Sequence, residues 1–109
     1  MTIDYKQEEF TVLPNFKGGE KEMHAKMFFD GRNRIMHSKL VPGASIGLHR
    51  HETSSEIMFF IAGTGKAIID GVEERVAPDM CHYCPKGCEH TLINDGTEEL
   101  EFYAVVPEQ

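Results

Sequence analysis

Positively charged residues are scarce in this sequence. Lys and Arg together number 11, against 18 Asp and Glu, so the formal net charge is −7. Binding to nucleic acid or to an anionic membrane surface needs basic patches that neutralise phosphate groups. The charge balance therefore argues against both kinds of partner.

Long apolar runs are missing as well. No stretch approaches the roughly 20 residues that cross a bilayer as a helix. The first ten residues, MTIDYKQEEF, lack the apolar segment of a secretory signal peptide. We therefore expect a cytoplasmic location. A length of 109 residues without internal repeats or linkers fits a single domain, residues 1–109, with a modest core.

Cysteines are few, odd in number and clustered, which makes a poor disulfide framework. Cys81, Cys84 and Cys88 form a C-x2-C-x3-C pattern, so a zinc site with a nearby histidine is an alternative to three free thiols. Such a site needs a fourth ligand and a loop that frees both members of C-x2-C. Because Cys81 and Cys84 fall on an expected strand and face opposite sides, we favour free thiols, with Cys84 as buried apolar filler and Cys88 at the rim of any cavity near His90.

Turn signals recur every eight to twelve residues, and the segments between them alternate or carry β-branched and aromatic residues. This spacing is typical of an all-β sandwich or barrel. The clearest hairpin joins two short apolar runs through Asp70 and Gly71, the sequence of a type I′ turn. The pattern predicts strands near residues 9–13, 22–29, 34–41, 45–50, 56–62, 65–70, 72–77, 80–84, 89–94 and 99–106.

A cluster of metal-binding residue types lies in the octapeptide HRHETSSE, residues 49–56. Side chains alternate along a strand, so His49 and His51 point to the same face and can grip one transition-metal ion. Glu56 opens the apolar run that follows the turn, where an ionisable group is costly unless it is paired or metal-bound. His90 begins another apolar strand after a Pro-Gly turn and can supply a fourth ligand. Three imidazoles and one carboxylate leave about two open positions on an octahedral metal, as substrate or dioxygen chemistry requires.

Two longer motifs contain these four residues. Residues 43–63 read GASIGLHRHETSSEIMFFIAG and residues 85–94 read PKGCEHTLIN. They resemble the first and second cupin motifs, G-x5-H-x-H-x4-E-x6-G and P-x-G-x2-H-x3-N, with every fixed position filled. The second motif usually begins with glycine six residues before the proline, and Asp79 stands there, so the motif spans residues 79–94 with one departure. We expect this departure to affect the local loop alone, because Asp suits a turn.

The resemblance implies a double-stranded β-helix, a jelly-roll barrel with a divalent metal near its centre. It assigns the metal ligands as His49, His51, Glu56 and His90, and it leaves the motif glycines, Pro85 and Asn94 to turns and packing. The ion can be manganese, iron, cobalt, nickel, copper or zinc. Small cupins of one domain are commonly homodimers, so we expect a homodimer that binds a small molecule.

Other residues near the motifs have weaker roles. His37 and His82 lie on expected flanking strands, and either can face the cavity as a proton donor to a group beside the metal, or be an ordinary hydrogen-bonded strand histidine. Met58 and Phe60 share the parity of Glu56 and should point into the barrel, first as core and secondarily as pocket wall.

The resemblance does not select one reaction. We favour a metal-dependent enzyme acting on a small organic molecule, with dioxygenase-type oxidoreductase chemistry first, while decarboxylases and sugar-phosphate isomerases share the fold. A non-enzymatic small-molecule or metal-sensing module is the second hypothesis. Metal-independent sugar epimerisation is the third, and it needs a cavity tyrosine such as Tyr83 or Tyr103. Only Arg50 and Lys86 are basic residues near the motifs, which disfavours a phosphorylated sugar.

Overall fold

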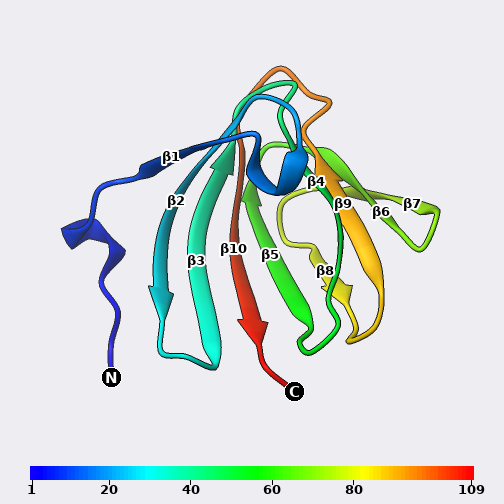
Figure 1. Cartoon of the computed structure of the whole chain (residues 1–109). Coiled ribbons are helices and arrows are strands. Elements are labelled where there is room, and N and C mark those ends of the chain that lie inside the picture. The colour runs from blue at the N-terminus through cyan, green and yellow to red at the C-terminus, as the bar shows by residue number, and fades with distance from the viewer.

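A computed structural model describes all residues, 1–109, and consists almost entirely of antiparallel strands (Figure 1). Two short 3₁₀ helices, which the sequence did not predict, precede the second strand: η1 (Tyr5–Gln7) and η2 (Phe16–Gly18). The strands are β1 (Thr11–Pro14), β2 (Glu22–Phe29), β3 (Asn33–Leu40), β4 (Ser45–Arg50), β5 (Glu56–Ala62), β6 (Gly65–Ile69), β7 (Val72–Val76), β8 (Cys81–Cys84), β9 (Glu89–Ile93) and β10 (Leu100–Pro107). All ten expected strands are present, within two residues of the predicted bounds. No helix is long and apolar enough to cross a membrane.

The strands form two sheets that face each other. The larger sheet has the order β1-β2-β3-β10-β5-β8, and the smaller one has the order β4-β9-β6-β7. The chain passes between the sheets at several connections, so β4 and β5, neighbours in sequence, belong to different sheets (Figure 1). This arrangement is the double-stranded β-helix expected from the sequence.

The core lies between the sheets and follows the two-residue periodicity of the strands. In β5, Met58 and Phe60 point inward and are fully buried, while Phe59 and Ile61 between and after them are exposed. The prediction that Met58 and Phe60 point into the barrel is confirmed. The other large buried side chains come from both sheets and include Met23, Leu40, Leu92, Leu100 and Phe102.

Turn chemistry sets the connections. Asp70 and Gly71 both have positive φ, 45° and 82°, and join the paired residues Ile69 and Val72. Positive φ at both central residues is what a type I′ turn requires. Asp79 also adopts a positive φ, 69°, so the residue at the usual glycine position keeps the left-handed backbone that glycine favours.

Asn94, the last fixed residue of the second motif, joins two loops to the core. Its buried side-chain amide donates hydrogen bonds to the carbonyl oxygens of Leu40 at 2.9 Å and Glu98 at 2.8 Å. Its side-chain oxygen accepts a hydrogen bond from the Gly96 amide at 3.0 Å. One side chain therefore satisfies three backbone groups, one at the end of β3 and two in the connection between β9 and β10.

Replacing Asn94 by alanine is expected to lower the free energy of unfolding by about 2–4 kcal/mol, because buried carbonyl groups lose their donors. Urea unfolding followed by circular dichroism measures this change. Glu98→Ala is the matched control, since it removes an exposed side chain from the same loop and keeps the backbone carbonyl. Equal stability of the two variants would contradict the assignment.

Candidate metal centre

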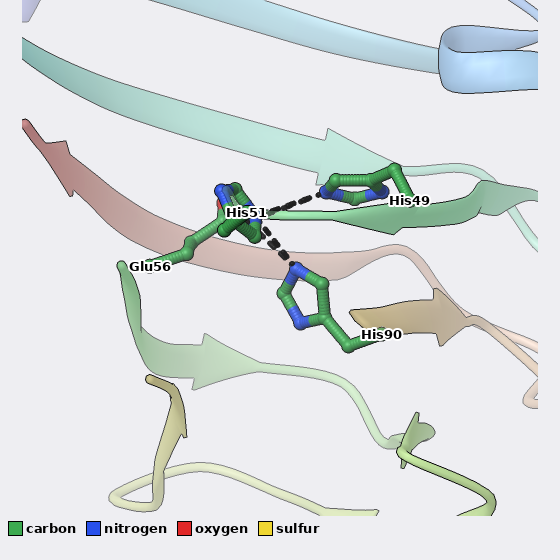
Figure 2. A group of neighbouring side chains, drawn as sticks. All are labelled: His49, His51, Glu56 and His90. Atoms are coloured by element: carbon green, nitrogen blue, oxygen red, sulfur yellow. Dashed lines mark hydrogen bonds and ion pairs between the residues drawn. The ribbon is translucent and has the colours of Figure 1, made fainter. Parts of the chain in front are cut away.

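Four side chains converge from three strands and one loop. His49 lies on β4, His51 directly follows that strand, Glu56 is the first residue of β5, and His90 lies on β9. Figure 2 shows the rings of His49 and His90 directed toward His51, with Glu56 beside it. One donor atom from each of the four lies within 4.8 Å of all the others. The structure therefore brings together all four residues that the sequence proposed as ligands.

Strand pairing places these groups. His49 and His90 are direct partners in the β4–β9 ladder, and the register shifts between Ile46 and His49. Gly47 lies in this irregular stretch, and a Cβ there would overlap the carbonyl oxygen of Lys17 in η2. A glycine at position 47 is thus needed for η2 to lie against β4, two residues before His49.

The donor atoms are crowded. The Nε2 atom of His51 lies 3.1 Å from Nε2 of His49 and 3.0 Å from Nε2 of His90. The Oε1 atom of Glu56 lies 3.0 Å from Nε2 of His51, 3.0 Å from Nε2 of His90 and 3.8 Å from Nε2 of His49. All three imidazoles present the same ring nitrogen to one small volume.

The opposite ring nitrogens show where the protons are. Nδ1 of His49 lies 2.7 Å from the Gly47 carbonyl oxygen, which can only accept, so a neutral His49 carries its proton on Nδ1. Its Nε2 atom then has an unprotonated lone pair. Nδ1 of His51 lies 3.1 Å from the Ser54 hydroxyl, which can accept in the same way. Lone pairs that converge on a carboxylate repel one another unless a cation lies between them, so this donor set fits a divalent transition metal.

The electrostatics of Glu56 favour its anionic form. Burial raises the pKa of its carboxyl group, but the neighbouring imidazoles of His49, His51 and His90 together outweigh burial and hold the pKa well below its usual range. The side chain is therefore an anion at neutral pH, as a metal ligand must be.

A cavity of about 690 Å³ opens onto one side of the cluster. His49, His51 and Glu56 line it, whereas His90 does not. Apolar walls come mainly from β2, β3 and β10 and include Met23, Met27, Met36, Phe102 and Val106. Such a hollow, with apolar walls and convergent polar and charged groups, is typical of a small-molecule site.

Basic residues reach this cavity from segments that the sequence analysis did not connect with it. Arg32 and Arg34 come from the β2–β3 connection and the start of β3, and Lys17 comes from η2. Arg34 lies over the Phe29 ring, 4.5 Å from its centroid, and 3.8 Å from the Met27 sulfur, and it has no carboxylate partner. The parity of Arg34 with buried Met36 was the signal that could have placed it inward.

His82 and His37 occupy different environments. His82 is buried, and its Nε2 atom lies 3.0 Å from Nδ1 of His90. Burial and the neighbouring His90 lower the pKa of His82, against the opposite effect of Glu74. His37 lies on the other face of β3 from buried Met36, where Glu101 contacts it at 2.6 Å. Strand alternation thus turns His37 away from the cluster, and the structure does not bring it there.

The tyrosines considered for epimerisation are outside the cavity. Tyr83 and Tyr103 are exposed, and Tyr103 stacks on His37 at the outer face of the larger sheet. Met58 and Phe60 belong to the core and do not line the cavity. The cavity therefore lacks the opposing tyrosine that metal-independent epimerisation needs.

The three cysteines do not gather into a metal-binding group. Cys81 is exposed, Cys84 is buried and Cys88 is intermediate, and all are free thiols. The only cluster of three or more metal-binding side chains is the histidine and glutamate group. Alternation along β8 separates Cys81 from Cys84, as expected from the sequence.

These environments predict an order of thiol reactivity. Burial raises the pKa of Cys84 to about 12, and a hydrogen bond to Asp70 raises the pKa of Cys88. Since the thiolate is the reactive form, iodoacetamide at pH 8 should label Cys81 first, Cys88 more slowly and Cys84 last. Peptide mass spectrometry measures the three rates, and labelling in urea provides the control in which they converge. Labelling of Cys84 as fast as Cys81 in the folded protein would contradict this order.

Known proteins are similar to this chain in sequence and in architecture. Residues 36–106 match the family model described as a cupin domain. An oxalate-binding protein from Thermotoga maritima is 33 % identical over 101 residues, which cover 86 % of this chain and 83 % of the relative. The crystal structure of a predicted oxalate decarboxylase from the same species has a TM-score of 0.93 at 26 % identity and covers 100 % of both chains. The cupin domain of Schizosaccharomyces pombe Cnp3, with a TM-score of 0.80 at 11 % identity over 99 % of this chain and 74 % of that one, shares the fold. This chain belongs to the cupin family.

Proposed function

We propose that this protein binds one divalent transition metal through its histidine and glutamate cluster and uses the site to hold a short dicarboxylate such as oxalate. The observation that carries the proposal is the meeting of four side chains of metal-binding type, His49, His51, Glu56 and His90. All but His90 line a cavity that also contains unpaired arginines. A bound ion, whether manganese, iron, cobalt, nickel, copper or zinc, would supply positive charge and open coordination positions for carboxylate oxygens.

Arg34 is placed to hold the other end of such a ligand. It pairs with Val106 across β3 and β10, and the neighbouring residue Val105 pairs with Ile57 on β5. The next position along β5 is Glu56, so Arg34 and Glu56 lie two strands apart on one face of the sheet. Strands are about 4.8 Å apart, which puts their backbones about 10 Å apart. A ligand that touches the cluster is thus within reach of the long Arg34 side chain.

The distribution of charge supports an anionic ligand. The chain has a net charge of −7, yet the basic residues lining this one cavity, Lys17, Arg32, Arg34 and Arg50, outnumber the acidic ones, Glu52, Glu56 and Glu108. Arg50 is paired with Glu89 at 3.7 Å, whereas Arg32 and Arg34 have no ion-pair partner. Guanidinium groups bind carboxylates through two parallel hydrogen bonds, so a free arginine in a cavity favours a carboxylate.

The relative from Thermotoga maritima supports the same ligand class, since it is named an oxalate-binding protein. Oxalate is small enough for the cavity and carries a carboxylate at each end. We therefore extend that ligand to this chain as a proposal.

Catalysis is a separate step of the proposal. Dioxygenase-type chemistry, the reaction narrowly favoured from the sequence, would place reactive oxygen next to the side chains of the cavity. Met23, Met27 and Met36 line this cavity, and thioethers oxidise readily to sulfoxides. We therefore favour binding, or a reaction without dioxygen such as decarboxylation, over dioxygen activation. Oxygen uptake and formate release, measured with oxalate and each loaded metal, distinguish the three outcomes.

Metal binding is tested by removing one ligand at a time. Glu56→Gln keeps the shape of the side chain and removes its charge, while His90→Ala removes a donor. Loss of a hydrogen-bond partner behind a metal ligand lowers metal affinity about 10–100-fold. Each of these variants loses a ligand itself, so its affinity for zinc or manganese should fall by more than that. Metal content after chelator treatment and reloading is measured by plasma mass spectrometry. His37→Ala is the control, and wild-type protein that takes up no metal would refute the proposal.

Ligand binding is tested by calorimetry with oxalate and the zinc-loaded protein. Arg34→Gln should weaken binding by about 10–100-fold, the value of a hydrogen bond to a charged group. Arg75→Gln removes the same charge from a residue that pairs with Asp95 outside the cavity, and it should bind oxalate as the wild type does. Wild-type affinity in Arg34→Gln would count against the proposed ligand pose.

A homodimer in the cytoplasm completes the proposal. Free thiols suit a reducing compartment. The outer face of the larger sheet exposes Phe59, paired with Tyr103 across β5 and β10, and contiguous apolar surface of this kind is typical of protein contacts. Light scattering should give twice the mass of one chain, and Phe59→Asp should shift it toward the monomer. A monomeric wild type would exclude the dimer.

A further inference from the structure

A hydrogen-bonded chain runs from the protein surface to the metal centre and ends on His90. The Oε1 atom of Glu74 lies 3.1 Å from Nδ1 of His82, and Nε2 of His82 lies 3.0 Å from Nδ1 of His90. The two rings stack, with centroids 5.2 Å apart and planes 19° from parallel. The side chain of His82 is 1 % exposed and that of Glu74 is 50 % exposed. These hydrogen bonds thus link the half-exposed carboxylate of Glu74 to the fully buried imidazole of His90.

The order of donors and acceptors along this chain follows from its outer end. A carboxylate can only accept, so His82 carries a proton on Nδ1 and, as a neutral ring, a lone pair on Nε2. That lone pair accepts a hydrogen bond from Nδ1–H of His90. The remaining nitrogen of His90, Nε2, is then unprotonated and faces Glu56 at 3.0 Å. The charge on Glu74 therefore selects which nitrogen of His90 is free to bind a metal.

Glu74 and His82 reach this position from the edges of both sheets. β7, which carries Glu74, ends the smaller sheet, and β8, which carries His82, ends the larger one. The two strands lie on the same side of the molecule (Figure 1). Neither residue lines the cavity, and His90 does not line it either. The hydrogen-bonded chain therefore approaches the cluster from a different side than the cavity does.

His90 differs in this respect from the other two imidazoles. Nδ1 of His49 binds a backbone carbonyl and Nδ1 of His51 lies beside a hydroxyl, both uncharged groups. Only His90 is connected to an anion outside the cluster. A carboxylate behind a ligating histidine fixes its orientation and raises its basicity.

We propose that Glu74, acting through His82, is a positioning residue for the metal centre that holds His90 with Nε2 unprotonated and thereby raises metal affinity. This rests on the metal binding proposed above. Glu74 and His82 are not among the fixed positions of the two cupin motifs.

The test compares two neighbouring glutamates on β7. Glu74→Gln keeps the size of the side chain and removes the charge that selects the tautomer. Glu73→Gln removes the same charge from a residue whose partner is Lys66 at 3.2 Å, away from the cluster. Zinc affinity, measured by competition with a chromophoric chelator, should fall about 10–100-fold in Glu74→Gln. It should stay at the wild-type value in Glu73→Gln.

A second measurement reads the tautomer without any metal. Long-range ¹H–¹⁵N correlation spectra of the metal-free protein should show His90 protonated on Nδ1, with Glu74→Gln moving His90 toward a mixture of tautomers. A purely structural contact between β7 and β8 would change stability and leave both zinc affinity and the tautomer unchanged. Equal zinc affinities for Glu74→Gln and Glu73→Gln, or a wild-type proton on Nε2 of His90, would overturn the inference. Wild-type protein that binds no zinc would instead refute the metal site itself.

Discussion

Three imidazole nitrogens and one carboxylate oxygen occupy a single small volume, and polar groups around it hold the three rings in place. The Gly47 carbonyl, the Ser54 hydroxyl and the His82 ring each contact the outer nitrogen of a different imidazole. The Gly47 carbonyl can only accept, so a neutral His49 has its inner nitrogen free as a donor, and the other two contacts are compatible with the same arrangement. Four donor atoms gathered in this way could hold a metal ion.

The cluster draws on both sheets. His49 and His90 are neighbours on one sheet, while Glu56 opens a strand of the other sheet. The buried side chains between the sheets fix the separation of the two layers. They include Met58, which lies two residues after Glu56 on the same face of β5. Three of the four side chains of the candidate metal site thus take their positions from packed strands, and His51 alone comes from a loop.

Much of this could be predicted from the sequence because strands and turns have local signals. Alternation placed His49 and His51 on one face, and turn residues such as Asp70 and Gly71 marked the hairpins. The role of Arg34 could not be predicted in this way, since it depends on which strands become neighbours in the larger sheet. The same holds for Glu74, which meets His82 only because the last strands of two different sheets come together. His37 and His82 looked alike in sequence, and only the pairing of the strands separated an outward ring from a buried one.

The close approach of η2 to β4 has a mechanical consequence. Lys17 lines the cavity with its side chain, while its backbone carbonyl lies so near Gly47 that no side chain fits between the two segments. Gly47 in turn orients His49 through its own carbonyl. A side chain at position 47 would therefore push η2 away from β4, and it would displace Lys17 from the cavity wall and the Gly47 carbonyl from the His49 ring at the same time.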